Sequence, residues 1–200
     1  MHKCKTLFLL LLIVAFNLYA VPYEIDLSGG TGGAYQSTVY TAPNGTVVTA
    51  SSGAYSNGYY EMKHMFNNTF GNGIDQYWLP LTGATTTLVI NLNQIYYLTG
   101  IRVFVNTMYS HHQSKYQMEI SPDGVNYTNI TGSYISTGMS YDNTWAINTN
   151  VDYIRFTLVS TTDWLTINEI ELFAENVVPE PSTFILAIMA LVFFVRYRKI

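Results

Sequence analysis

The sequence predicts an all-β protein, built as an antiparallel β-sandwich. Short runs of β-branched and apolar residues recur through the middle of the 200-residue chain, and several alternate between apolar and polar side chains. Turn-forming residues separate these runs, and no stretch away from the two ends shows a long apolar repeat of 3.6 residues. Aromatic residues make up 15% of the chain and charged residues only 11%, which suits strands with large buried side chains.

The first part of the predicted domain, residues 28–58, is rich in Gly, Ser, Thr and Asn and has few large side chains. Such a segment is either a flexible leader or a set of loops around two or three short strands. The stretch "VVTAS" has strand character and its flanks carry turn signals. We therefore expect loops with short strands, one of them over residues 46–51.

Six further strands are expected after this segment. The alternation is clear where Tyr116, Met118 and Ile120 share one face of a run. The sequence Ser-Pro-Asp-Gly at 121–124 ends that run, because Pro presets φ and Gly accepts a positive φ. The expected strands are residues 85–94, 98–106, 116–121, 125–130, 151–160 and 165–173.

The first 20 residues have the three parts of a secretory signal peptide. Lys3 and Lys5 precede an apolar run over residues 7–16, and Ala20 ends the segment with a small side chain. An uncleaved membrane helix is the alternative, but the run is short for crossing about 30 Å of hydrocarbon. We expect cleavage near Ala20 and therefore an exported protein.

The body between the two ends is acidic. From residue 21 to residue 183 the sequence has four basic residues and all 13 acidic ones, a net charge of −9. Nucleic acids and anionic lipid surfaces require clustered Lys and Arg, so the charge argues against both as partners. The only cysteine, Cys4, precedes the apolar run of the predicted signal peptide. The mature protein would then have no thiol, disulfide or cysteine metal site.

The order of motifs from residue 49 to residue 175 resembles the discoidin or coagulation-factor type C domain (F5/8 type C). "ISPDGVNYTNI" resembles the strand-turn-strand of this family with its Asp-Gly, "YIRFTLVS" its Tyr-Ile-Arg strand, and "INEIELFAE" its closing strand. The family belongs to the galactose-binding-like jelly rolls. The resemblance implies an eight-stranded antiparallel jelly-roll β-sandwich over residues 24–175, with ligand loops gathered at one end.

The same resemblance implies a structural calcium ion near a Phe-Asp-Gly turn and the last strand. Phe66-Asn67-Asn68 matches that turn with Asn67 where Asp is usual, and Glu169 or Glu171 would supply the carboxylate from the strand. Calcium accepts amide oxygens, so Asn67 keeps a ligand atom but removes a charge, which weakens the site. A turn capped by Asn67 without metal is the alternative. No other cofactor is expected.

The sequence gives no indication of catalysis. It has no nucleophile elbow, zinc-protease motif or phosphate loop. His111 and His112 lie in the polar stretch "NTMYSHHQSK", and adjacent histidines seldom bind one metal ion, so a solvated loop is the better explanation. Paired carboxylates are the alternative, because Asp75, Asp142 and Asp163 fall in expected loops, but nothing marks any of them. We expect a protein that is not an enzyme.

Glycan binding is the function that the aromatic residues favour. Aromatic faces stack on sugar rings, and a few polar groups fix the orientation of the sugar. Trp78 is expected in the core, because the family buries a Trp after its first turn, and Trp164 is either exposed or part of the core. We expect the two loop histidines to be exposed. No loop arginine matches the one that many sugar-binding relatives use, so the glycan, neutral or basic, stays open. The candidate contacts are Tyr59, Tyr60, His64, Tyr109, His111, His112 and Trp164.

The C-terminal segment, residues 176–200, resembles the PEP-CTERM sorting signal. The triplet Pro179, Glu180 and Pro181 precedes an expected membrane helix over residues 183–195. This helix is short, because a stable span needs roughly 20 apolar residues. The prolines keep Glu180 extended and accessible outside the membrane, and the basic tip favours the cytoplasmic side. The basic tip, 196–199, contains Arg196, Arg198 and Lys199.

The PEP-CTERM resemblance implies an exosortase-type membrane protease of a Gram-negative bacterium as a partner. Export, transient anchoring in the inner membrane, cleavage near the triplet and release to the cell surface or an exopolysaccharide matrix would follow. The sequence therefore predicts an exported surface or matrix protein that binds an extracellular glycan. A purely structural matrix protein without a small ligand is the first alternative, and a secreted hydrolase is the second.

Overall fold

The computed structural model describes residues 22–55, 59–73, 76–80, 85–110, 112–161 and 164–175. The predicted signal peptide and sorting segment lie outside the described residues, as do His111, Asp75 and Asp163. Clustering of contacts places Tyr23–Ala174 in a single compact unit. None of the helices in this described part is long and apolar enough to span a membrane.

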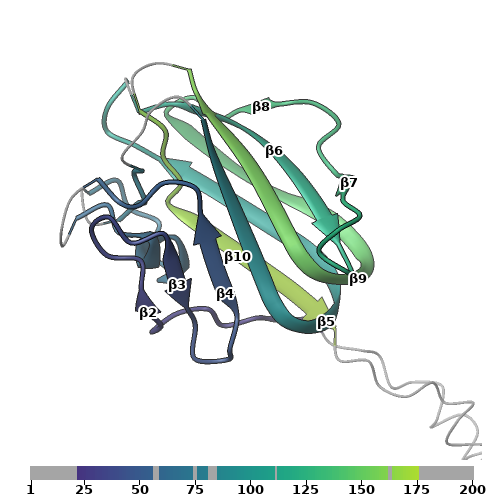
Figure 1. Cartoon of the computed structure of the whole chain (residues 1–200). Coiled ribbons are helices and arrows are strands. Elements are labelled where there is room, and N and C mark those ends of the chain that lie inside the picture. The colour runs from purple at the N-terminus through teal and green to yellow at the C-terminus, as the bar shows by residue number, and fades with distance from the viewer. Residues whose placement is uncertain are drawn as a thin grey trace, which may run out of the picture. The chain divides into compact units, whose positions relative to one another are not determined.

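Within the described residues the chain forms ten strands and one short 3-10 helix, η1 (Figure 1). The all-β prediction is therefore confirmed, and so is the expectation of short strands within residues 28–58. The elements are β1 (Pro22–Glu24), β2 (Thr31–Gly32), β3 (Val39–Thr41), β4 (Val47–Ala50), η1 (Met62–Phe66), β5 (Thr85–Asn106), β6 (Ser114–Ser121), β7 (Thr128–Asn129), β8 (Ile135–Ser136), β9 (Ser140–Ser160) and β10 (Glu169–Glu175).

Two long strands, β5 and β9, organise the sandwich. Residues 85–91 of β5 pair with residues 153–159 of β9, and residues 96–106 of β5 pair with residues 140–151 of β9, antiparallel throughout. The register shifts between these two stretches, where Asn93 takes a left-handed φ of 64°. Such irregularities bend a strand, so β5 and β9 curve from one layer into the other (Figure 1).

Each of these two strands contributes one half to each layer of the sandwich. The first half of β5 pairs with the second half of β9, and the second half of β5 pairs with the first half of β9. One layer has the order β2-β3-β4-β5-β9-β6-β7, with β8 also paired to β6. In the other layer β10 lies between β1 and β5. Thr99 Oγ1 donates to the carbonyl of Phe173 at 3.3 Å, which places β10 beside the second half of β5. The arrangement is an antiparallel sandwich, as predicted.

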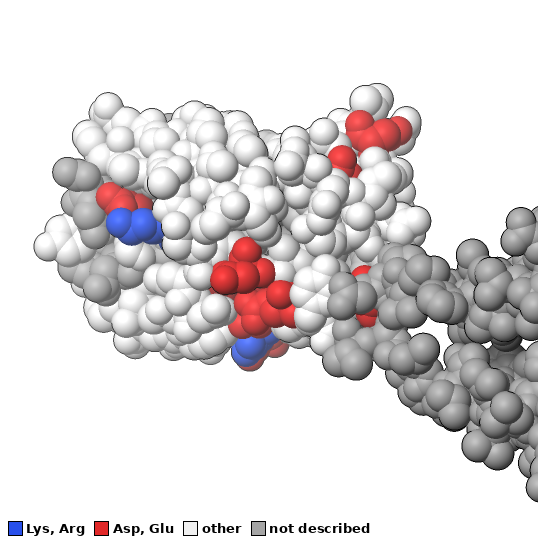
Figure 2. Space-filling view, turned by 90° about the horizontal axis from the view of Figure 1, so that it is seen from below, with Lys and Arg blue, Asp and Glu red and all other residues white. Residues whose placement is uncertain are grey.

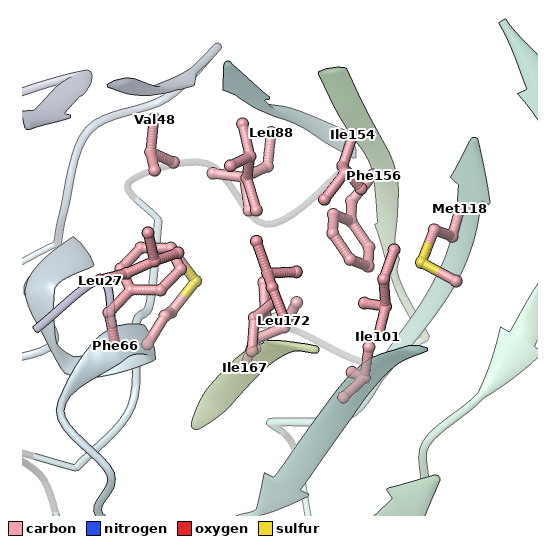
Figure 3. Packing of buried hydrophobic residues seen from close by; sticks show 14 of the residues in the cluster. Leu27, Val48, Phe66, Leu88, Ile101, Met118, Ile154, Phe156, Ile167 and Leu172 are labelled. Carbon is pink, nitrogen blue, oxygen red and sulfur yellow. The ribbon is translucent and has the colours of Figure 1, made fainter. Parts of the chain in front are cut away.

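The core lies between the two layers (Figure 3). Leu88 of β5 and Phe156 of β9 face Leu172 of β10 across the interface, and all three are fully buried. Burial of one such side chain contributes roughly 1.5–3 kcal/mol to the free energy of unfolding. Trp78 is also fully buried, as expected. The predicted alternation in β6 is confirmed, because Met118 is buried and its neighbours are only half-buried.

The strands differ from the expected ones in four main places, and one of them is the strand expected over residues 165–173, which begins only at Glu169 as β10. Residues 85–94 and 98–106 form one continuous strand, β5, and β9 begins at Ser140 rather than at residue 151. Asp142 was expected in a loop, but it lies in the strand β9. The strand expected over residues 125–130 is shortened to β7, because the N–H groups of Val125 and Asn126 donate to the Asp123 carboxylate and prolong the turn.

Candidate functional site

Three loops start from the same end of the sandwich. Ser114 pairs with Ser160, and Thr85 pairs with Val159, so the first residues of β5 and β6 lie beside the last residues of β9. The segments that adjoin these strand ends therefore begin next to one another. They are residues 51–84 between β4 and β5, residues 107–113 between β5 and β6, and residues 161–168 between β9 and β10.

Six rings from these three loops form a continuous series, which we call the aromatic row. Successive ring centroids are 4.7, 6.3, 5.1, 5.9 and 4.8 Å apart. The rings are tilted or edge-on to one another, which are favourable geometries for aromatic pairs. In order, the row is Trp164, Tyr55, Tyr60, Tyr77, His112 and Tyr109.

The aromatic row is exposed at both ends and buried in the middle. Tyr55 is 44% exposed and Tyr109 is 36% exposed, whereas Tyr77 is fully buried. Trp164, which the sequence left open between surface and core, is half-buried with its ring against Tyr55. Tyr59, which precedes Tyr60 in the chain, is also exposed. The loop end thus exposes the rings of Tyr55 and Tyr109 to solvent, while the polar groups of Tyr77 and His112 are buried in the middle of the row.

Tyr77 and His112 contact each other in the buried middle of the row. The Tyr77 hydroxyl lies 3.3 Å from Nδ1 of His112. Burial raises the pKa of the Tyr77 hydroxyl above its usual value, and the hydroxyl also interacts with Tyr60 and Thr107, so Tyr77 stays neutral. His112 is only 5% exposed. The expectation that His112 is an exposed loop histidine is therefore wrong.

Tyr60 has a strained backbone. Its φ is 55°, in the left-handed region that a bulky side chain rarely adopts. The Leu79 N–H donates to the Tyr60 carbonyl at 3.2 Å, and the Leu79 carbonyl accepts the Tyr55 N–H at 2.8 Å. These bonds hold the loop in place. Strain of this kind costs about 1–3 kcal/mol and is concentrated at functional sites.

The other candidate histidine, His64, lies in the first of the three loops but outside the aromatic row. It lies in η1 and is buried, with Nδ1 3.4 Å from the side-chain nitrogen of Asn67. Its burial leaves His64 little surface for a glycan, although the sequence included it among the candidate contacts. Conversely, the sequence-based site omitted Tyr55, although this residue stands in the aromatic stretch "GAYSNGYY" with Tyr59 and Tyr60. The local density of tyrosines was the signal that could have included it.

Two of the residues expected to hold calcium, Asn67 and Glu169, meet at the same turn. Glu169 is buried, and its carboxylate accepts the Thr69 N–H at 3.2 Å. Burial raises the pKa of Glu169 to about 8, the backbone N–H groups of the turn oppose this increase, and the charge of Glu171 adds to it. Asn67 Oδ1 accepts the same Thr69 N–H at 3.0 Å.

These contacts fit calcium poorly. Calcium takes about six to eight oxygen ligands. The Glu171 carboxylate, however, already accepts a hydrogen bond from Nη1 of Arg102 at 2.9 Å. The side-chain oxygens of Asn67 and Glu169 accept the backbone N–H of Thr69. Within the described ranges no group of three His, Cys, Asp or Glu side chains is able to hold a metal ion. The arrangement suits a carboxyl that fixes a turn, and a calcium site stays a prediction.

The described residues include four Lys and Arg side chains, and three of them are ion-paired. Arg102 is held by two bonds of 2.7 and 2.8 Å to Asp142, and Arg155 by one of 2.7 Å to Glu119. On the face shown in Figure 2, Lys and Arg atoms lie against acidic atoms and most of the surface is uncharged. Lys63 is the only Lys or Arg in the sequence of the three loops, and it is ion-paired with Glu61.

Comparisons with known proteins agree with this architecture. The family model of the F5/8 type C domain matches residues 47–173. A comparison with curated protein sequences found no match. A family 32 carbohydrate-binding module of Clostridium perfringens NanJ, solved in complex with galactose, has a TM-score of 0.53 and 14% identity, over 76% of this chain and 99% of that chain.

Two further solved structures show the same fold. CpGH89CBM32-5 from Clostridium perfringens, in complex with GalNAc-beta-1,3-galactose, has a TM-score of 0.51 and 15% identity, over 64% of this chain and 95% of that chain. A Ruminococcus gnavus GH29 fucosidase has a TM-score of 0.53 and 14% identity, over 68% of this chain but only 26% of that chain. At these identities the likeness concerns the fold, and it confirms the predicted galactose-binding-like sandwich.

Proposed function

The chain belongs to the F5/8 type C domain family, and from this premise we propose that it is a glycan-binding protein without catalytic activity. The observation that carries the proposal is the aromatic row, whose exposed members are Tyr55, beside the half-buried Trp164, and Tyr109. Flat apolar rings at a loop end match the apolar face of a sugar, and the hydroxyl groups of the tyrosines supply polar contacts.

The charge of the loops favours a neutral or basic glycan over an acidic one. A sialic acid or uronic acid carboxylate is usually bound by Arg or Lys. The only such residue in the loops, Lys63, is already paired with Glu61. The complexes of the two Clostridium perfringens proteins with galactose and GalNAc-beta-1,3-galactose support a neutral sugar.

A glycan array probed with the full chain tests the proposal. We expect retention on one group of neutral or amino-sugar glycans and none on their sialylated or uronic-acid counterparts. Retention only on acidic glycans would contradict the charge argument. The absence of retention on every glycan would favour the alternative, a structural matrix protein without a small ligand. The burial of His112 is the observation that favours this alternative.

We also propose that the protein is exported and sorted. The support is the signal-peptide pattern of residues 1–20 and the PEP-CTERM pattern of residues 176–200. In this proposal an exosortase-type protease recognises Pro179, Glu180 and Pro181 at the inner membrane of a Gram-negative bacterium. The released domain then acts at the cell surface or in an exopolysaccharide matrix, where it meets its glycan.

A further inference from the structure

We propose that Asn168 is a positioning residue of the glycan site. Its buried side-chain amide joins the three loops that form the aromatic row, and thereby sets the relative position of the two exposed rings, Tyr55 and Tyr109. This inference rests on the proposed function. It assigns Asn168 an indirect role, because a side chain with no exposed surface cannot touch the glycan.

The amide of Asn168 makes four hydrogen bonds, which fix its orientation. Nδ2 donates to the carbonyl of Gly71 at 2.8 Å and to that of Gln76 at 3.2 Å, both in the first loop. Nδ2 also donates to the carbonyl of Asn106 at 3.0 Å, and Oδ1 accepts the Asn106 N–H at 2.7 Å. Asn106 ends β5 and directly precedes the second loop, whereas Asn168 itself ends the third. One buried amide therefore connects all three loops.

The connection to the first loop reaches Tyr55 through a short stretch of backbone. Gln76, whose carbonyl Asn168 holds, lies three residues before Leu79. The carbonyl of Leu79 accepts the Tyr55 N–H at 2.8 Å, and the Leu79 N–H donates to the Tyr60 carbonyl at 3.2 Å. The position of Gln76 therefore affects the backbone of Tyr55 and of the strained Tyr60.

The connection to the second loop reaches Tyr109. Thr107 follows Asn106, and the Thr107 hydroxyl accepts the Tyr109 N–H at 3.2 Å. The backbone N–H of Asn168 donates to the carbonyl of Phe104 at 3.1 Å, which anchors Asn168 to β5. The backbone of Tyr109 is thus placed relative to Asn168, as is that of the other exposed ring.

Removal of the amide would leave buried carbonyl groups without donors. A carbonyl in a protein interior is almost always paired, and one that loses its donor is destabilising unless it moves to reach another donor or water. The Trp78 N–H donates to the Ile167 carbonyl at 2.8 Å, and this separate bond still joins the first loop to the third. The second loop would therefore shift relative to the other two. A glycan that contacts both exposed rings depends on that spacing.

The test measures the affinity of the full chain for GalNAc-beta-1,3-galactose and for the strongest glycan from the array. The proteins are the wild type, Asn168→Ala, Asn168→Asp and Ser121→Ala. Aspartate has nearly the shape of asparagine, but its ionised carboxylate has no proton to donate. Both Asn168 variants should lose about tenfold or more in affinity, because the two exposed rings no longer keep their spacing. Ser121→Ala should bind as the wild type does.

Ser121 is the matched control because its polar side chain is also fully buried. Its hydroxyl donates to the Asp123 carboxylate at 2.8 Å and accepts the Gly124 N–H at 3.0 Å. Ser121 ends β6, whose first residue adjoins the second loop, so its variant removes hydrogen bonds at the opposite end of the sandwich. Binding is measured where denaturant unfolding shows every protein to be folded. A loss of affinity that merely followed a loss of stability would appear in Ser121→Ala as well.

Two outcomes would overturn the proposal: wild-type affinity in both Asn168 variants, or an equal loss of affinity in Ser121→Ala. Hydrogen exchange of the wild type without ligand keeps the test independent of the folding of the variants and of the glycan. The amides of Asn106 and Leu79, on the two sides of the Asn168 amide, should open together with one free energy. Separate opening of the two would contradict the inference. If no glycan binds, the proposed function fails, while this exchange measurement still decides the role of Asn168.

Discussion

The ring of Trp164 meets the ring of Tyr55 edge-on, with the centroids 4.7 Å apart and the planes at 66°. Tyr55 precedes η1 and Trp164 precedes β10, so neither loop alone forms this surface. Edge-on aromatic pairs contribute about 0.5–1.5 kcal/mol beyond the area that they bury. The pair therefore joins two loops, and Tyr55 remains 44% exposed beside the half-buried Trp164.

The strained backbone of Tyr60 gives a prediction about stability. Tyr60→Gly and Tyr60→Ala both remove the ring contacts with Tyr55 and Tyr77. Glycine accepts the φ of 55° without strain, so Tyr60→Gly should be more stable than Tyr60→Ala by about 1 kcal/mol in denaturant unfolding. The matched control is the exposed Tyr134, which has no positive φ, and there Ala should equal or exceed Gly. If the Gly variant were also the more stable one at the control position, the stability difference at Tyr60 could not be attributed to backbone strain.

The buried carboxyl of Glu169 gives a prediction about pH. Its pKa is raised from 4.5 to about 8 in the folded protein, mainly by burial. Between these two values the unfolded chain has lost the proton that the folded protein keeps, so stability should fall as the pH rises from 4.5 to 8. The fall should be on the order of a few kcal/mol, measured as the midpoint of denaturant unfolding.

Glu169→Gln is the matched variant for this prediction. The amide keeps an oxygen for the Thr69 N–H but has no proton to lose. Subtracting its stability curve from that of the wild type should leave a slope confined to the region between the two pKa values. Parallel curves for the two proteins would show that Glu169 is not the titrating group.

Calcium offers a third prediction, at the same turn. If Asn67 and Glu169 or Glu171 bind Ca²⁺, millimolar calcium should raise the melting temperature and a chelator should lower it, by mass action on the folded state. A bound ion would also hold Glu169 ionised and remove the pH dependence described for it. The N–H contacts of these side chains favour the opposite result, a melting curve that calcium leaves unchanged.

The tail gives a fourth prediction. Protein released from the surface of the native host should lack the signal peptide and everything beyond about Pro181, because the prolines keep the triplet extended for a protease. Intact-mass measurement checks this directly. Changing Pro179, Glu180 and Pro181 to Ala should leave the full-length protein in the inner membrane. Surface-released protein that still carries residues 184–200 would make the sorting proposal wrong.

Much of the fold could be predicted because the strand signals are local. The alternation in β6 and the turn at 121–124 follow from neighbouring residues, and the structure confirms both. The first half of β9 could not be recognised in this way. Its residues include Asp142, Asn143 and Asn148, which disfavour strands, and the segment becomes a strand through its pairing with residues 96–106 of β5.

The residue types of the candidate site could be predicted from the sequence, but the burial of each side chain could not. Tyrosines and a tryptophan in loops indicated an aromatic surface, and the structure brings Tyr60, Tyr109 and Trp164 into one row. Nothing in the sequence shows that His112 is buried within this row while Tyr109 remains exposed. Their relative depth depends on Tyr77, which is 35 residues away in the chain and reaches His112 only through the fold.

The most direct test of the account is calorimetric titration of the glycan selected by the array into the wild type, Tyr55→Ala, Trp164→Ala and Tyr134→Ala. Tyr134 is as exposed as Tyr55, at 44%, but lies between β7 and β8, outside the aromatic row. Each variant of the row should lose tenfold or more in affinity, while denaturant unfolding shows a loss below the roughly 3–5 kcal/mol of a core aromatic. Tyr134→Ala should bind as the wild type does. Equal affinity of all four proteins would contradict glycan binding by the aromatic row.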